Sequence, residues 1–285
     1  MAVYEQTYRR YTGELTPQRT RFMVPLRYAF KEAAASRLVL LLLIVGGLVP
    51  LVGAILIYLH HNLQALEAMH LPLDRILPID STFFEFILRF QSAVGFFLAL
   101  IIGPGLVAPD LRNNALPLYF SRPFSRSEYV LGKIGVLFLL LSALTWGSGL
   151  LLFALQAVLT SGWLGANLGL AWAILAASLE WITVLSLVTL AISAWVKWKP
   201  VARVALLAVF FVLRGFGAAL NAVLGTRWGS LFSLGELNDI VRGSLFNSPR
   251  PEDLPAAAAW VALAVACAIF LAILARRVRA YEVVR

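Results

Sequence analysis

Residues 110–133, DLRNNALPLYFSRPFSRSEYVLGK, form a charged segment between two long apolar runs. The segment carries six charged side chains, whereas the 22 residues before it carry only one, Arg89. A polar segment in this setting is expected to lie in water between two membrane spans. Within it, Ser125 is followed three residues later by Glu128, the spacing of a capping box. This spacing predicts that a short helix begins after Ser125.

The overall composition is typical of an integral membrane protein. Hydrophobic residues make up 60% of the 285 residues, against roughly 45–50% apolar residues in soluble domains. The chain has 24 Lys and Arg residues and 15 Asp and Glu residues, which give a net charge of +9. We attribute this excess to loops on the cytoplasmic side of a membrane and expect no nucleic-acid partner, because no basic face is interleaved with stacking aromatic side chains.

Six apolar stretches are long enough to cross a bilayer as helices, since a span needs about 20 residues. We therefore predict an all-α polytopic fold, with a six-span domain over residues 38–275 between a basic N-terminal segment, 1–37, and a basic tail, 276–285. The predicted spans are residues 38–59, about 83–107, from about 129 or 131 to 159, 168–195, 201–224 and 256–274.

The distribution of basic residues predicts the orientation of these spans. With the N-terminus in the cytoplasm, 18 Lys and Arg residues fall on the inner side and four on the outer side, and the other two lie within spans. Positive residues accumulate in cytoplasmic loops. Both termini and the central loop, residues 109–133, are therefore expected to be cytoplasmic.

Two further segments are expected to form helices near the membrane surface. From residue 22 to 34, apolar residues alternate with Arg27, Lys31 and Glu32, which indicates an amphipathic interfacial helix, a solvated basic tail being the alternative. Residues 225–254 are too long for a hairpin and too apolar for a free loop. We interpret them as re-entrant helices in the outer leaflet, where protein must cover any non-helical backbone.

The central loop also carries a spaced motif, small-Arg-Pro-x-Ser-Arg-x-x-Tyr/Phe-x-x-Gly-Lys. In this motif and in its place after the second span, the loop resembles the cytoplasmic loop of ABC-2 type transporter permeases, while the rest of the chain resembles them only in topology. The residues that match are Ser121, Arg122, Pro123, Ser125, Arg126, Tyr129, Gly132 and Lys133.

The resemblance implies the transmembrane permease subunit of an ATP-driven exporter in a bacterial inner membrane. Such a subunit is surrounded by membrane lipid and pairs with a second permease copy, as a homodimer or heterodimer. It also binds a cytoplasmic ATPase subunit, which holds ATP and Mg. The chain itself has no G-x-x-x-x-G-K-[ST] phosphate-binding loop, so we expect neither a cofactor nor enzymatic activity on this chain.

By the same resemblance, the central loop is expected to dock onto the ATPase. Arg122, Arg126 and Glu128 would make polar contacts, and Phe124 and Tyr129 would anchor in an apolar pocket. The alternatives are a solvated loop without a partner, a non-transporting scaffold or force-transmitting subunit, and a secondary transporter, which usually has two similar halves. The residues expected to couple to the ATPase are Arg122, Pro123, Phe124, Ser125, Arg126, Glu128, Tyr129 and Lys133.

Two pairs of ionisable side chains within the predicted spans are candidates for ion pairing. Glu180 and Arg214 fall at similar depths in the fourth and fifth spans, which predicts an ion pair, with a cavity-lining role or separate snorkelling as alternatives. Glu85 and Arg89 are one helical turn apart and are expected to pair. Thr82 and Glu85 also have the spacing of a capping box.

Metal and disulfide chemistry find little support in the sequence. His60, His61 and His70 lie within eleven residues, but their spacing matches no metal-binding signature, and we expect interfacial histidines without a metal ligand role. Cys267 is the only cysteine, which excludes an intrachain disulfide.

Overall fold

The computed structural model describes residues 17, 20, 23–62, 78–121, 125–248 and 254–278, and every regular element in these ranges is a helix. Six of its helical segments are long and apolar enough to cross a membrane, which confirms the predicted all-α fold with six spans. The chain is an integral membrane protein. The six segments are Arg37–His60, Ser81–Arg112, Arg126–Leu159, Leu168–Trp195, Lys199–Leu224 and Ala256–Arg277.

Four spans are single helices, and two are interrupted. The second span changes to a 3-10 turn at Gly103–Gly105, where Pro104 lies, and the third contains a π-helical turn between two α-helices. The single helices are α2 (Arg37–His60), α11 (Leu168–Trp195), α12 (Lys199–Leu224) and α14 (Ala256–Arg277); the second span consists of α5 (Ser81–Ile102), η2 (Gly103–Gly105) and α6 (Ala108–Arg112), and the third of α8 (Arg126–Ser142), η3 (Ala143–Gly147) and α9 (Ser148–Leu159).

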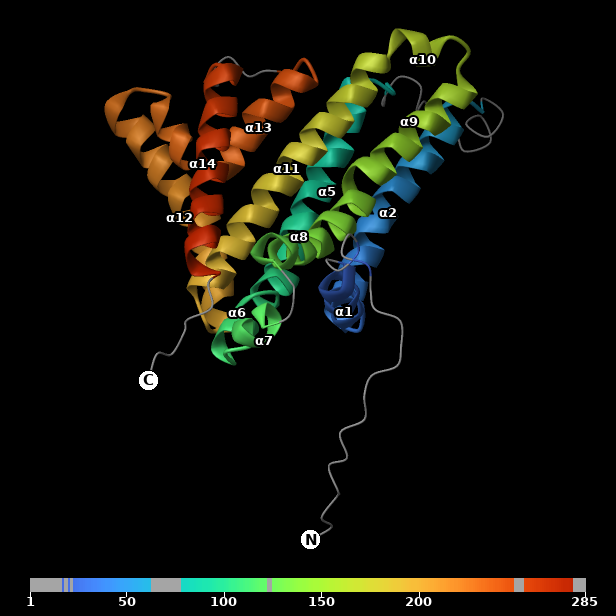
Figure 1. Ribbon diagram of the computed structural model, residues 1–285. Helices are drawn as coiled ribbons and strands as arrows, with labels where there is room; N and C mark the ends of the chain where they lie inside the picture. The colour runs from blue at the N-terminus through green and yellow to red at the C-terminus, as the bar shows by residue number, and fades with distance from the viewer. Residues whose placement is uncertain are drawn as a thin grey trace, which may run out of the picture.

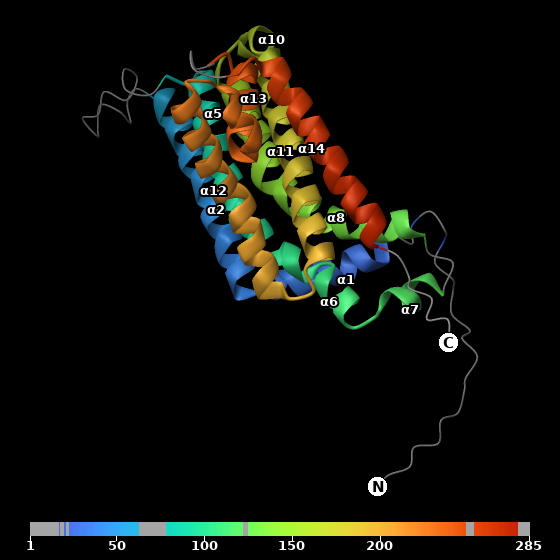
Figure 2. The same ribbon diagram turned by 90° about the vertical axis from the view of Figure 1, so that its left-hand side faces the viewer.

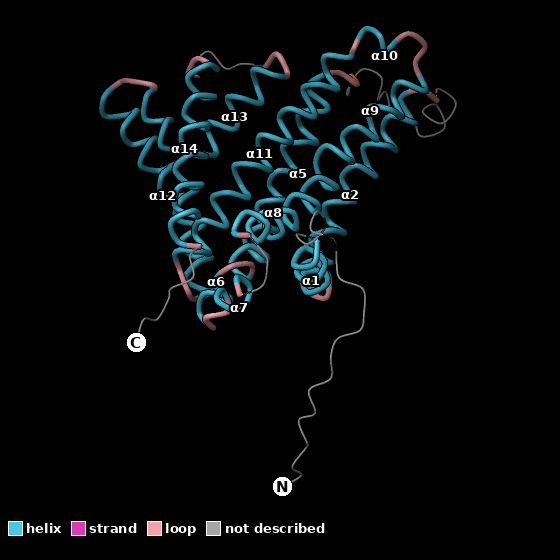
Figure 3. Tube along the Cα trace, viewed as in Figure 1, coloured by secondary structure: helices cyan, strands magenta, loops and turns pink. Residues whose placement is uncertain are grey.

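The remaining helices are short and connect or cover the spans. Figure 3 shows how little of the described chain lies outside helices. These short helices are α1 (Met23–Ala34), α7 (Leu116–Phe120), α10 (Trp163–Ala166), η4 (Trp228–Phe232) and α13 (Leu234–Leu245).

Helix α11 lies at the centre of the bundle, between α14 on one side and α5 and α8 on the other (Figure 1). Its inward side chains are largely buried, whereas α2, α12 and α14 bury only a small share of their apolar stretch. Large apolar side chains are exposed on the outer helices, such as Ile44 at 65% and Val204 at 65%. Such faces are expected to contact lipid, because a bilayer imposes no cost on exposed apolar surface.

One end of the bundle, here called the basal end, carries α1, α6 and α7 (Figures 1 and 2). The C-terminal end of α14 also lies there (Figure 1). Helix α1 confirms that a helix forms in the segment predicted to be amphipathic, and it packs against α8. Gly135 of α8 lies directly against Leu26 of α1: a Cβ atom added to this glycine would lie 2.4 Å from Leu26 Cδ1. The position of α1 at the membrane surface stays a prediction.

The segment predicted to be re-entrant folds as two helices after α12. The chain reverses at Gly225, whose φ of 60° is left-handed and accessible to glycine without steric cost. Helix η4 then packs back against α12, and α13 contacts α11, α12 and α14. At the tightest point, Cβ atoms added to Gly217 and Gly229 would lie 2.4 and 2.3 Å from the carbonyl oxygen of the other residue. The depth of these helices in the membrane stays a prediction.

Candidate functional site

A buried polar cluster joins the second and third spans at the basal end. Asp110 of α6 lies opposite Tyr129 and Lys133 of α8. The Tyr129 hydroxyl donates to Asp110 Oδ2 at 2.6 Å, and Lys133 Nζ lies 2.9 Å from the same oxygen. Tyr129 is fully buried and Lys133 is 8% exposed. One carboxylate therefore ties α6 to the first turns of α8.

Aromatic rings complete this cluster. Tyr129 and Lys133 are four residues apart, so both project from one face of α8. The Tyr129 ring lies 5.4 Å from the ring of Tyr119 and 6.2 Å from that of Phe120, both in α7. Burial and the negative charge of Asp110 raise the pKa of the Tyr119 hydroxyl, which stays neutral at physiological pH. The central loop thus folds back onto the start of the third span.

A second set of contacts fixes α6 to the central helix α11. The backbone N–H groups of Val107 and Ala108 both donate to Ser193 Oγ, at 3.2 and 3.0 Å, and Ser193 Oγ donates to the carbonyl oxygen of Pro104 at 3.3 Å. Directly above, a Cβ atom added to Gly103 would lie 1.8 Å from Thr189 Cγ2. A displacement of α6 would therefore be transmitted to α11 as well as to α8.

The structure places the predicted coupling residues in three groups. Arg122, Pro123 and Phe124 lie outside the described residues. Arg126 is exposed at the start of α8. Tyr129 and Lys133 are buried and contact Asp110, so the expected insertion of the Tyr129 ring into a pocket of the ATPase does not fit its position. The coupling role of Lys133 stays a prediction.

Ser125 and Glu128 form the predicted capping box. The Glu128 N–H donates to Ser125 Oγ at 3.2 Å, and the Ser125 N–H donates to Glu128 Oε2 at 2.6 Å. The prediction of a separate short helix after Ser125 is wrong. The box caps α8 itself, which is the first part of the third span. Two short helices were not predicted from the sequence: α6, at the end of the second span, and α7, in the central loop.

Replacing Ser125 with alanine is expected to destabilise the protein by about 1 kcal/mol, because the cap at the start of α8 is lost. Thermal unfolding in detergent measures this effect. Ser161, an exposed residue of the connection between α9 and α10, supplies the control. A Ser161→Ala variant as unstable as Ser125→Ala would show that the cap contributes nothing specific.

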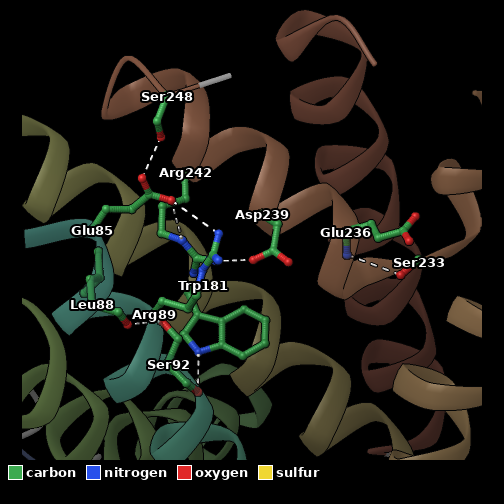
Figure 4. Close-up of polar contacts among 10 residues, drawn as sticks. All are labelled: Glu85, Leu88, Arg89, Ser92, Trp181, Ser233, Glu236, Asp239, Arg242 and Ser248. Atoms are coloured by element: carbon green, nitrogen blue, oxygen red, sulfur yellow. Dashed lines mark hydrogen bonds and ion pairs between the residues drawn. The ribbon is translucent and has the colours of Figure 1, made fainter. Parts of the chain in front are cut away.

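At the opposite end, Glu85 is the centre of a second polar cluster (Figure 4). Arg89 Nη2 lies 3.4 Å from Glu85 Oε1, which confirms the predicted pair, and Arg242 Nε lies 3.9 Å from the same oxygen. Ser248 Oγ donates to Glu85 Oε2 at 2.5 Å, and Arg242 also pairs with Asp239. Arg242 is 3% exposed, although the sequence placed it in an outer loop. This cluster fixes α13 to α5.

The predicted capping box of Thr82 and Glu85 is wrong. Asp80 caps α5 instead, because Asp80 Oδ1 accepts hydrogen bonds from the N–H groups of Thr82 and Phe83 at 3.0 and 3.1 Å. Glu85 is thereby left to interact with α13.

The predicted ion pair between Glu180 and Arg214 is also wrong. Arg214 Nε lies 3.9 Å from Glu236 Oε1 of α13 instead. Helix α13 contacts both α11 and α12. Among the residues that the structure describes, neither carboxyl oxygen of Glu180 has a hydrogen-bond partner, and both are buried. An ionisable group in a span costs about 2.5–3.5 kcal/mol on insertion scales, so Glu180 requires an explanation.

The sequence matches no model of a known protein family, and no curated protein is significantly similar to it.

Sequence reasoning missed the residues that give both clusters their long-range contacts. In the sequence, Asp110 is only one of six charges of the central segment, and Ser193, Glu236 and Arg242 give no local signal. Of the histidines, His61 donates through Nδ1 to the Ile57 carbonyl oxygen at 2.9 Å, and its Nε2 lies 2.7 Å from Thr160 Oγ1; His70 lies outside the described residues. In the described ranges, no group of three His, Cys, Asp or Glu side chains is placed to hold a metal ion.

Proposed function

We propose that this protein is the transmembrane subunit of an ATP-driven exporter of the ABC-2 type. The observation that carries the proposal is the pair of contacts made by α6: Asp110 ties it to α8, and Ser193 ties it to α11. The segment that follows α6 is the charged loop whose motif resembles the ATPase-docking loop of these permeases. This arrangement supports a loop that receives force and passes it to two spans.

In this proposal, the basal end faces the cytoplasm and α1 lies on the inner membrane surface. The separate ATPase subunit holds ATP and Mg and docks against the central loop, with Arg126 among its contacts. Closure of the ATPase pulls on α6, whose contacts move α8 and α11 together. A second permease copy, identical or related, completes the transport pathway within the bacterial inner membrane.

The test is an affinity purification in mild detergent, followed by mass spectrometry and an ATPase assay of the eluate. A stoichiometric ATPase is expected to co-purify with the wild-type chain and to be lost from Arg126→Glu, because the substitution reverses an exposed charge of the docking loop. Lys197→Glu makes the same charge change on the exposed connection between α11 and α12 and is expected to retain the ATPase.

An eluate without any ATPase would overturn the proposal and leave a secondary transporter or a non-transporting scaffold. Loss of the ATPase from both variants would show that total charge, rather than the loop, decides the association.

A further inference from the structure

A groove of about 390 Å³ runs between α11 and α14. Exposed residues on its walls include Thr183 of α11 and Trp260 and Ala264 of α14, so the groove is open to the membrane-facing surface. Its other walls are almost entirely apolar. These walls are formed by Ala176, Leu179, Val184, Leu263 and Cys267. The charged exception among the lining side chains is the carboxyl group of Glu180.

Glu180 is the one ionisable carboxyl group of this groove, and its acceptors are unused. Neither of its buried carboxyl oxygens receives a hydrogen bond from any residue that the structure describes. The nearest hydroxyl on the same helix, that of Thr183, donates to the Leu179 carbonyl oxygen at 2.7 Å. Buried acceptors in proteins are nearly always paired, because a missing hydrogen bond is costly away from water. The described part of the chain therefore supplies no donor for Glu180, which favours one from a bound molecule.

A cation is the donor that suits a carboxylate best, because a charge-assisted hydrogen bond is stronger than a neutral one. Among the described residues, the guanidinium of Arg242 contacts Asp239 and Glu85 and forms no ion pair with Glu180.

Trp260 adds a second feature that suits a cation. An indole ring attracts a positive charge placed over its face, and the combination of a carboxylate and an aromatic ring is a common way to recognise organic ammonium ions. The apolar walls suit the hydrocarbon part of such a molecule. A small inorganic cation would leave these walls without a partner.

We propose that the groove between α11 and α14 binds an amphipathic ammonium compound from the bilayer. Its ammonium group lies near Trp260 and donates to Glu180 once this side chain, whose oxygens are covered in the unbound protein, turns toward the groove; its apolar body packs along Leu263 and Val184. The inference goes beyond the proposed function, because binding at this groove needs neither ATP nor an ATPase.

The experiment measures binding to the purified chain in phosphatidylcholine nanodiscs, with empty nanodiscs as background. The probes are dansylcadaverine, a fluorescent amine, and an analogue in which a carboxylate replaces its ammonium group. Fluorescence anisotropy is expected to show saturable binding of the amine and none of the carboxylate. Glu180→Gln is expected to weaken amine binding at least about tenfold, since a charge-assisted hydrogen bond is lost.

Two controls keep the test independent of folding. Glu32→Gln removes the same charge from an exposed position on α1 and is expected to bind the amine as the wild type does. Ala264→Trp fills the groove from an exposed position without changing Glu180, and it is expected to abolish amine binding. If Glu180→Gln does not yield a monodisperse protein, amine binding by Ala264→Trp alone tests whether the groove is the binding site.

Equal binding of the two probes, or unchanged amine binding by both Glu180→Gln and Ala264→Trp, would overturn the proposal. So would a dimer in which a bismaleimide links Cys267, the only cysteine of the chain, to its counterpart, because a second copy would then cover the groove. Loss of the ATPase in the affinity purification leaves this binding result unaffected, so the two proposals fail separately.

Discussion

Replacing Lys133 with methionine is expected to destabilise the protein by about 3–5 kcal/mol, the range measured when one partner of a buried ion pair is removed. The side chains of Lys133 and Asp110 are only 10% and 17% exposed, so the remaining carboxylate would stay buried with Tyr129 as its hydrogen-bond donor. Methionine has nearly the length of lysine, and packing is therefore largely preserved. Chemical unfolding in detergent, followed by tryptophan fluorescence, measures the change.

Lys197→Met supplies the matched control, because Lys197 is exposed at the same end of the bundle. It is expected to alter stability by less than about 0.5 kcal/mol, as surface substitutions usually do. Similar losses from Lys133→Met and Lys197→Met would show that the cluster does not hold the second and third spans together.

A double-mutant cycle separates the ion pair from packing. Asp110→Asn removes the negative charge but keeps an acceptor for the Tyr129 hydroxyl. The double variant Asp110→Asn with Lys133→Met is expected to be more stable than the sum of the single effects predicts, by roughly 1–3 kcal/mol, since contacting residues couple in this range. Strict additivity would contradict a direct interaction.

Gly217→Ala is expected to destabilise the contact between α12 and η4 by about 1–3 kcal/mol, the usual cost of overpacking. The added methyl carbon would lie 2.4 Å from the Gly229 carbonyl oxygen, a backbone atom that cannot rotate away. The two helices would have to separate, which would also displace α13. Hydrogen exchange of residues 228–245, together with thermal unfolding, measures both effects.

Gly215 of the same helix offers a close control for this substitution. No atom lies within 4 Å of a Cβ atom added there. Gly215→Ala is therefore expected to be neutral or to stabilise α12 by up to about 1 kcal/mol, because alanine favours a helix more than glycine does. If both alanine variants behave alike, the tight glycine contact is not required.

The sequence predicted what depends on local chemistry. The six spans follow from hydropathy, and their bounds agree closely with those observed. The box of Ser125 and Glu128 and the pair of Glu85 and Arg89 follow from spacing within a single helix. Each of these features needs only residues that are neighbours along the chain.

The errors arise where a partner comes from a distant part of the chain. Matching depths suggested that Glu180 would meet Arg214, but Arg214 lies beside Glu236 of α13, and Glu180 forms no ion pair with any described residue. Likewise, a motif cannot show that Tyr129 turns inward to Asp110. Depth and periodicity place a residue along its own helix, and they do not determine which neighbouring helix it faces.

The bonds of Ser193 have a consequence for biosynthesis. They satisfy the backbone at the break between η2 and α6, yet they come from a residue 85 or more positions later in the chain. Spans leave the ribosome in order, so the second span enters the bilayer with two N–H groups at this break still without their final acceptor. These N–H groups gain their acceptor only after the fourth span has been inserted. Unsatisfied backbone groups are costly in lipid, so the second span is less stable in the bilayer until then.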